Sequence, residues 1–297
     1  MSELTIVLVA LGAVALAFMA VWIMTVIAKG GFAFPSVLEI GIGLLTDFLD
    51  TLGIGSFAPT TSLFKFFKLV PDEKIPGTLN AGHTLPTIAE ALIYTTIIGV
   101  DPRTMILMIV AAVVGAWLGA GLVARWPRRY VQIGMGSALT VAALLFVMKN
   151  LGEIPGGGTA LGLTGATLVF AVFANFCLGA LMTIGIGLYA PCLILIAMLG
   201  MDPRAAFPIM MGSCAFLMPI ASVRFMRFDA YSLKAALGLT IGGIPGVLIA
   251  AYIVKSLPLF WIYWLVVVVV LYAAFTMLRS AYIERNGAAA SVPENAG

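Results

Sequence analysis

Four ionisable residues in an otherwise apolar part of the sequence are spaced so that they could form one site. Asp47 and Asp50 are three residues apart and His83 and Glu90 are seven apart, so each pair lies on one face of a helix. Ionisable groups at membrane depth are costly and indicate function. A buried carboxyl resists ionisation and a histidine exchanges its proton near neutral pH, so we expect these residues to carry a coupling proton. The alternative is that they satisfy one another structurally.

A motif rich in glycine follows the two aspartates directly and occurs twice. Residues 51–60 read TLGIGSFAPT and residues 183–192 read TIGIGLYAPC, with six of ten positions identical at a spacing of 132. Further pairs keep this register, with a slip of one in the last: Pro76 with Pro208, Leu85 with Leu217, and Gly115 with Gly246. A match that holds its register over so many residues indicates two homologous halves.

The chemistry of this motif is that of a broken helix. The glycines free the backbone from helical dihedral angles, and Pro59 and Pro191 suit the first turn of a new helix. Such a turn has unpaired N–H groups and a dipole that favours a negative ligand. We therefore predict an anion site where two helix N-termini converge near mid-membrane. The predicted substrate-binding residues are Gly53, Ile54, Gly55, Ser56, Thr60 and Thr61 in the first half, Gly185, Ile186, Gly187 and Tyr189 in the second, and Asn80 and Ser213 as a polar rim.

The composition determines what surrounds these elements. Of the 297 residues, 62% are hydrophobic and only 10% are charged, whereas a soluble domain carries about a quarter charged residues. Residues 4–28, 104–124, 161–201 and 257–278 contain no charge, and about 20 apolar residues make a membrane-spanning helix. The runs are continuous rather than alternating, which excludes barrel strands. The prediction is an all-α polytopic membrane protein with no nucleic-acid partner.

The repeat divides the chain into four parts. We predict a leading transmembrane helix at 1–31, a first repeat at 32–160, a second repeat at 161–282 and a disordered tail at 283–297. Each repeat begins with an apolar helix, the glycine break and a short returning helix, and then has three full-length segments. The segments are expected at about 78–99, 104–126 and 129–149 in the first repeat, and at 205–224, 231–255 and 259–279 in the second.

The distribution of lysine and arginine indicates how each broken element sits in the membrane. If each element crosses once, eight basic residues lie on each side, whereas re-entrant hairpins place twelve on one side and four on the other. Cytoplasmic loops concentrate Lys and Arg, so the hairpin is favoured. A hairpin plus three crossings makes the halves inverted repeats, an architecture of many secondary transporters. The amino terminus is then outside and the carboxyl terminus is cytoplasmic.

An intramembrane enzyme is disfavoured by the residue types available. The chain has one histidine, no His-x-x-x-His and no spacing typical of a nucleophile–base pair. We therefore expect no catalytic residue, no bound metal and no cofactor. A rival of another class is a cation-handling carrier with Asp47 and Asp50 as ion ligands.

These residues resemble the TauE/SafE family of sulfite exporter-like anion permeases. The resemblance extends from about Glu39 to Leu278 and comes from the duplicated Gly-Ile-Gly elements, the run Asp202-Pro-Arg-Ala-Ala, and Gly99-Val-Asp-Pro-Arg before a helix that ends in Arg125-Trp-Pro-Arg-Arg. The family's element, roughly Gly-x-Gly-Gly-Gly, has bulkier residues here, which suggests a distinct branch. The resemblance implies transport of sulfite, organosulfonates or similar oxyanions across the cytoplasmic membrane without ATP. The partners expected are a small anion, a coupling proton and the bilayer; a homo-oligomer is compatible with the sequence.

Overall fold

The computed structural model describes residues 3–29, 34–71, 74–123, 128–151, 158–182, 188–256 and 259–290. Apart from one isolated bridge, the regular structure in these residues is helical. The helices are α1 (Glu3–Lys29), α2 (Val37–Thr51), α3 (Phe57–Phe67), α4 (Ile75–Ile97), α5 (Pro102–Val123), α6 (Arg128–Asn150), α7 (Gly165–Met182), α8 (Tyr189–Met198), η2 (Pro203–Ala205), α9 (Ala206–Arg227), α10 (Leu233–Ser256) and α11 (Leu259–Ala290).

Several of these helices are suited to lipid. Within the described residues, four stretches are long and apolar enough to cross a membrane: Glu3–Ala28, Gly165–Met182, Pro203–Arg227 and Leu233–Ile253. Large apolar side chains such as Trp117, Phe173 and Tyr252 are exposed on the outer surface, as expected where lipid rather than water is the neighbour. The predicted class, a helical membrane protein that crosses the bilayer several times, agrees with these helices.

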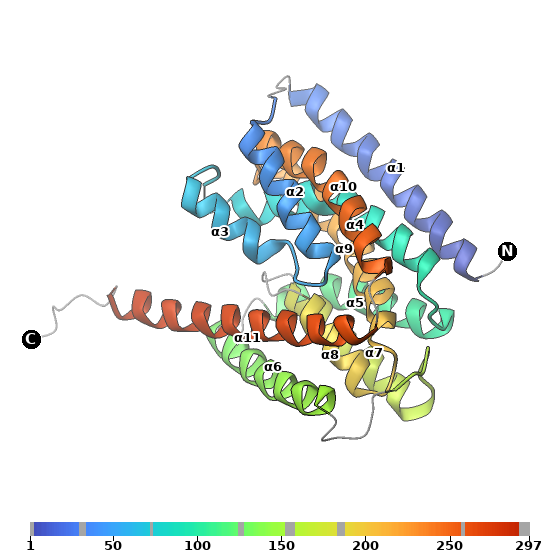
Figure 1. The fold of residues 1–297 in the computed structure, drawn as a ribbon. Coiled ribbons are helices and arrows are strands. Elements are labelled where there is room, and N and C mark those ends of the chain that lie inside the picture. The colour runs from blue at the N-terminus through green and yellow to red at the C-terminus, as the bar shows by residue number, and fades with distance from the viewer. Residues whose placement is uncertain are drawn as a thin grey trace, which may run out of the picture.

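The first glycine motif breaks the helix where the sequence predicts. After α2 the chain passes through Gly53 and Gly55, which have φ angles of 91° and 89°, and begins α3 at Phe57. These angles lie in the left-handed region that glycine adopts without steric cost. The chain runs along α2, turns and returns beside it along α3 (Figure 1). The second motif, at 183–187, lies outside the described residues, between the end of α7 and the start of α8.

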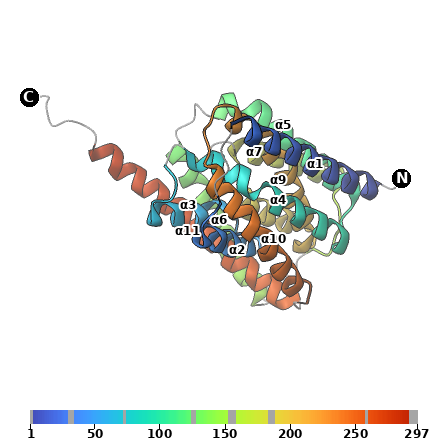
Figure 2. The same ribbon diagram turned by 90° about the horizontal axis from the view of Figure 1, so that it is seen from above.

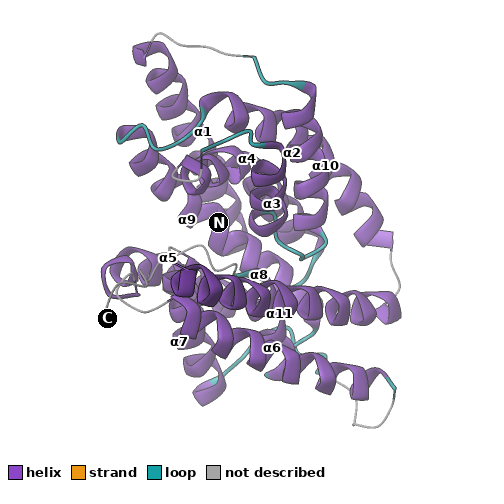
Figure 3. Ribbon diagram, turned by 90° about the vertical axis from the view of Figure 1, so that its left-hand side faces the viewer, coloured by secondary structure: helices purple, strands orange, loops and turns teal. Residues whose placement is uncertain are grey.

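The main helix contacts join one half of the chain to the other. Helix α2 packs along α10 and α5 packs along α7, while α4 packs against α9 and α6 against α11. The α6–α11 pair lies at one end of the molecule, and α2 and α10 lie side by side away from it (Figures 1 and 3). Helix α1 covers the outside of this assembly and packs on α9, α4 and α5 (Figure 2). The two halves therefore form one intermixed structure.

Short contacts also join the ends of helices. The linker between the halves accepts backbone hydrogen bonds from both Asp-Pro corners: Asp101 N–H donates to Leu161 O at 2.7 Å, and Asp202 N–H donates to Ala160 O at 2.9 Å. At other helix ends, Lys74 pairs with Asp229 at 3.6 Å. The two backbone contacts bring the segment before α7 next to the start of α5 and the end of α8, and the ion pair joins the start of α4 to the end of α9.

One predicted boundary needs correction. The tail predicted at 283–297 is helical as far as Ala290, because α11 continues without interruption past the last apolar run. The residues there, Arg285 to Ala290, include three alanines, and alanine is the best helix former. Composition rich in small residues was therefore a poor sign of disorder at this point.

Candidate functional site

A buried chain of polar groups joins α2, α3 and α4. The Nδ1 atom of His83 lies 2.8 and 3.0 Å from the two carboxylate oxygens of Asp47, and its Nε2 atom lies 3.1 Å from the Thr60 hydroxyl. All three side chains have 0% exposure. The predicted residues Asp47, His83 and Thr60 thus meet in the protein interior, although they come from three helices.

The hydrogen-bond directions in this chain determine how many protons it holds. The Thr60 hydroxyl donates its only hydrogen to Ser56 O at 2.8 Å, so it accepts from His83 Nε2–H. A further proton must lie between His83 Nδ1 and Asp47, because two lone pairs do not attract at 2.8 Å. The Asp47–His83 pair therefore shares one proton and has zero net charge, whether written as an ion pair or as two neutral groups.

The side chain of Asp50, a residue of α2, lies at the amino terminus of α3. Its Oδ1 atom accepts a hydrogen bond of 2.6 Å from the backbone N–H of Ser56, the N-cap residue of that helix. Both residues are buried at 3% exposure. A helix N-terminus stabilises negative charge through its free N–H groups and its dipole. The predicted anion-binding amide is therefore present, and a carboxylate of the protein itself is bound to it.

Glu90 connects this region to the second half of the chain. Its Oε1 atom lies 2.7 Å from the Thr51 hydroxyl, and the Tyr189 hydroxyl in the first turn of α8 donates to its Oε2 atom at 3.1 Å. Tyr94 donates to Thr51 O at 3.2 Å from the same face of α4. Tyr189 is thus the predicted second-half residue that reaches the carboxylates.

Three carboxylates come close together here with one imidazole. Oxygen atoms of Asp47, Asp50 and Glu90 all lie within 4.8 Å of one another, and all three residues are buried. Such a group could hold a cation, but each carboxylate has a donor already: His83 for Asp47, the Ser56 amide for Asp50, and Tyr189 for Glu90. The arrangement is that of a hydrogen-bonded network, in which each carboxylate already has a partner, rather than an open ligand set.

Two close approaches of the chain hold the network in place. Gly243 of α10 packs on the Asp47 side chain, because a Cβ atom there would lie 2.8 Å from Asp47 Cγ and 2.6 Å from Pro86 Cγ. Gly53 in the first break faces the second half, within 3.5 Å of Leu193 Cδ1 and 3.6 Å of Met210 Cε for an added Cβ. The first broken element therefore lies against α8 and α9.

Comparison with known families gives a match to the second half of the chain. Residues 167–296 match the family model Sulfite exporter TauE/SafE. The resemblance that the sequence indicated is thereby confirmed for that range, which begins in α7 and extends beyond α11. No curated protein and no solved structure matches the chain. The match covers less than half of the 297 residues, so it gives a similarity of the second half to this family.

Not every residue predicted for a TauE/SafE-type anion site joins the network. Asn80 donates to Pro76 O on its own helix at 2.9 Å, and Thr61 is half-buried on α3 with no hydrogen bond among the described residues. Ser213 is buried and has other partners: it accepts from the Asn175 amide at 3.2 Å and donates to Ile209 O. Ile54 donates its N–H to Leu49 O within the break. Gly185, Ile186 and Gly187 lie outside the described residues.

Three buried residues on these helix faces were not predicted from the sequence. Thr51 begins the glycine motif, Thr87 lies on α4 between His83 and Glu90, and Tyr94 lies four residues after Glu90. Helical spacing could have identified the last two, because residues three or four apart share a face. Thr87 is buried at 1% exposure and its hydroxyl has no hydrogen-bond partner in the described structure.

Proposed function

We propose that the protein is a secondary transporter for a small oxyanion such as sulfite or an organosulfonate, coupled to protons. The observation that carries this proposal is the hydrogen bond from the Ser56 amide to the Asp50 carboxylate. It shows a buried helix N-terminus that accepts an oxyanion group. Ser56, Thr60 and Tyr189 are the side chains best placed to contact a substrate there, with Gly53 and Gly55 supplying the break.

The chemistry of the proposed site suits an anion without cationic side chains. The described ion pairs of lysine and arginine are elsewhere: Lys74 with Asp229, Arg204 with Asp202 and Lys234 with Glu39. Backbone N–H groups and hydroxyls are then the donors available, and these suit tetrahedral or pyramidal oxyanions. The TauE/SafE match favours sulfite and its relatives among them.

The contacts between the halves support inverted repeats. In the register of the repeat, α2 corresponds to α7 and α10 to α5, so the pairs α2–α10 and α5–α7 are equivalent. The pairs α4–α9 and α6–α11 each join a helix to its own counterpart. Such a pattern is expected from a two-fold relation between repeats, the basis of alternating access in many transporters.

The contacts at the helix ends support the re-entrant hairpins. If each broken element crossed the membrane once, the linker at 158–163 and the corner at Asp202 would lie on opposite faces, and so would Lys74 and Asp229. Both pairs are in direct contact. With hairpins each pair shares a face. We therefore retain the orientation in which the amino terminus is outside and the carboxyl terminus is cytoplasmic, in the cell membrane.

A flux panel in proteoliposomes tests the proposal. The purified protein is assayed with sulfite, sulfate, thiosulfate, methanesulfonate and a monocarboxylate, each with and without an imposed pH gradient. We expect saturable uptake of at least one sulfur oxyanion that an inward proton gradient accelerates. Empty liposomes supply the control, and the absence of flux for every anion would contradict the proposal.

The same assay separates the rival cation carrier. The three carboxylates within 4.8 Å of one another are the observation that favours it. A divalent-metal arm of the panel, with Mn²⁺ and Zn²⁺, should show no uptake above empty liposomes if anions are the substrate. Metal flux without anion flux would favour the carrier with Asp47 and Asp50 as ligands.

A further inference from the structure

The proton count around the carboxylates can be extended from Asp47 to Glu90. The Thr51 hydroxyl has one hydrogen but lies 2.7 Å from two acceptors, Asp47 O and Glu90 Oε1. Both contacts are full two-centre hydrogen bonds when the hydroxyl donates to Asp47 O and a protonated Glu90 donates to the hydroxyl oxygen; with an ionised Glu90 the single hydrogen is shared between the two acceptors. Glu90 Oε2 is then free to accept from Tyr189, as observed. The geometry is thus satisfied by a neutral Glu90.

Asp50 differs from its neighbours in this count. Its carboxylate receives a hydrogen from the Ser56 amide at 2.6 Å, so this contact requires an acceptor and no added proton. The Asp47–His83 pair is neutral as a unit, and a neutral Glu90 satisfies its contacts. Of the three carboxyl groups, Asp50 is therefore the one whose observed contact needs no added proton, and it lies where the helix dipole of α3 favours an anion.

The groups that face Asp50 come from several helices. Asp47 shares α2 with it, while His83 and Glu90 face it from α4 and interact with it electrostatically. Tyr189 of α8 and Cys214 of α9 do so from the second half. The basic residue described on α10, Lys234, pairs instead with Glu39 at the other end of α2, at 3.7 Å. None of the described neighbours is a cation dedicated to Asp50.

An unsatisfied hydroxyl lies on the same face of α4 as His83 and Glu90. Thr87 lies four residues after His83 and three before Glu90, on the face of α4 that meets Asp47 and Thr51. It is buried at 1% exposure, and its hydroxyl has no partner among the described residues. Other buried threonines, such as Thr51 and Thr84, donate to the carbonyl one turn earlier. A buried unpaired hydroxyl is costly, so this one is suited to a group that arrives only in part of the cycle.

We propose that Asp50 is a tethered competitor of the substrate, bound to the Ser56 amide when the site is empty and displaced as a neutral acid when an oxyanion binds. This inference rests on the proposed transport function and names the residue that couples it to protons. The Asp50 carboxylate takes one proton from solvent, releases the amide to the incoming anion, and leaves Thr87 as an alternative partner for its new O–H group. The net charge of the network is then the same before and after a monovalent anion binds.

Proton uptake on binding tests this mechanism directly. Purified protein in weakly buffered detergent solution is titrated with an anion that the flux panel shows to be carried, and a pH indicator counts the protons. We expect about one proton per bound anion for the wild type, and an affinity that strengthens about tenfold for each unit fall in pH while Asp50 is ionised. For Asp50→Asn, whose amide oxygen can still accept from Ser56 N–H, we expect uptake near zero and an affinity independent of pH.

A matched control uses the other buried carboxylate of α2. Glu39 has 3% exposure but caps the helix start through Ser36, away from the network, and Gln preserves that type of cap. Glu39→Gln should keep the wild-type proton uptake. If the anion titrates by itself near neutral pH, as sulfite does, its own contribution is the same for all three proteins and cancels in the differences.

The outcomes separate this inference from the transport proposal. No anion flux in the wild type would contradict the transport function itself. Flux with no proton uptake in the wild type, or uptake that persists in Asp50→Asn, would overturn the role of Asp50 and leave the transport function standing. Loss of uptake in both Asp50→Asn and Glu39→Gln would also overturn it. Because the wild-type count is decisive by itself, a failure of Asp50→Asn to fold would not protect the inference.

Discussion

The two copies of the glycine motif lie in different surroundings. Around the first, Asp47, Asp50, His83 and Glu90 form a buried hydrogen-bonded network. Their counterparts in the second half, in the register of the repeat, are Gly179, Met182, Ala215 and Ser222. The sequence motif therefore occurs in both halves, whereas among the described residues the buried carboxylate–histidine network is built from the first half.

An equivalent helix contact shows how this difference is accommodated. Where α5 meets α7, Gly179 lies directly against the backbone carbonyl of Ala112. At the corresponding place between α10 and α2, the glycine is on the other helix, and Gly243 leaves space for the Asp47 side chain. One contact uses its small residue for close helix packing, and the other uses it to admit a carboxylate.

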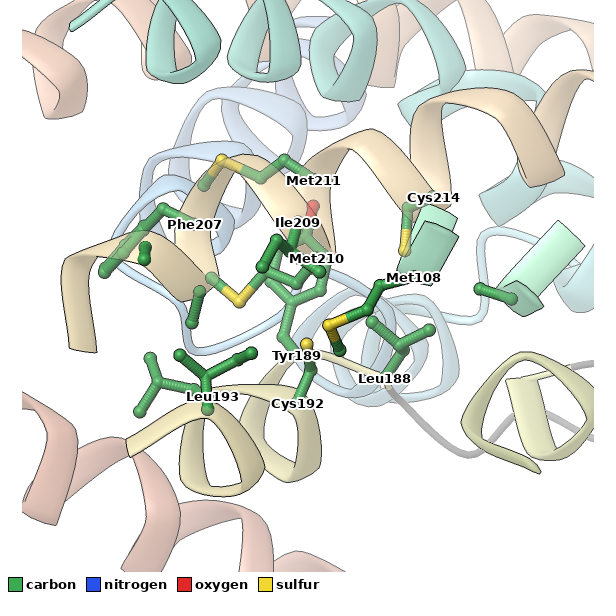
Figure 4. Packing of buried hydrophobic residues seen from close by; sticks show 14 of the residues in the cluster. Met108, Leu188, Tyr189, Cys192, Leu193, Phe207, Ile209, Met210, Met211 and Cys214 are labelled. Carbon is green, nitrogen blue, oxygen red and sulfur yellow. The ribbon is translucent and has the colours of Figure 1, made fainter. Parts of the chain in front are cut away.

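The packing near the second element is apolar and rich in sulfur. Met108, Cys192 and Cys214 gather beside Tyr189 and Met210 in the core (Figure 4). Methionine and cysteine pack as adaptable apolar groups. Tyr189 carries the hydroxyl that crosses from this region to Glu90. The surroundings of the first motif are therefore ionisable, and those of the helix that follows the second motif are apolar. A single described side-chain hydrogen bond, from Tyr189 to Glu90, joins Tyr189 to the carboxylates.

The largest loss of stability should follow from removing one member of the buried Asp47–His83 pair. Asp47→Ala leaves His83 buried without its partner, and loss of one member of a buried pair costs about 3–5 kcal/mol. We expect a correspondingly lower free energy of unfolding, measured by thermal or denaturant unfolding in detergent. The double variant Asp47→Ala/His83→Ala should recover part of the loss. Equal stability of Asp47→Ala and the wild type would show that the pair contributes nothing.

Gly243→Ala tests whether the α2–α10 contact needs a small residue to leave space for Asp47. The new methyl group would lie within 2.8 Å of Asp47 Cγ and 2.6 Å of Pro86 Cγ, and such overpacking costs about 1–3 kcal/mol. Because it displaces Asp47, it should also reduce anion flux in proteoliposomes. The matched change Ala112→Gly should cost only about 0.5–1 kcal/mol and leave flux unchanged. Equal flux losses in the two variants would contradict the distinction between the halves.

Tyr189→Phe removes the hydrogen bond from α8 to Glu90. We expect a loss of about 0.5–1.5 kcal/mol in unfolding free energy, the usual net value of one hydrogen bond, and a reduced transport rate. Tyr94→Phe is the control, since it removes a hydrogen bond of similar length to Thr51 within the first half. It should affect stability similarly and flux less. A transport rate that is the same in both variants would mean that the Tyr189–Glu90 contact has no special role.

The smallest effect is expected at Ser213, which the sequence placed in the substrate site. In the structure it bonds to Asn175 and to its own helix, so Ser213→Ala should cost at most about 1 kcal/mol. The order of preference among the anions of the flux panel should not change. A changed preference would return Ser213 to the substrate site and extend that site to α9.

Local features of the sequence were sufficient to predict most of the secondary structure. The apolar runs became helices close to their predicted limits, and Gly53 and Gly55 adopt the left-handed angles that interrupt the first element. Both signals depend on neighbouring residues alone, because hydropathy over about 20 residues and the absence of a Cβ act locally. The tail was mistaken for the same reason, since composition does not reveal how far a helix extends.

Helical spacing in the sequence was sufficient to place Asp47 with Asp50 on one helix face and His83 with Glu90 on another. Only the tertiary structure decided which groups form hydrogen bonds. His83 bonds to Asp47, and Asp50 accepts from the Ser56 amide. Glu90 accepts from Tyr189, which is 99 residues away in the chain. The physical reason is that face-sharing relates residues within a turn or two of one helix. Which faces meet depends on packing between helices that are distant in the chain.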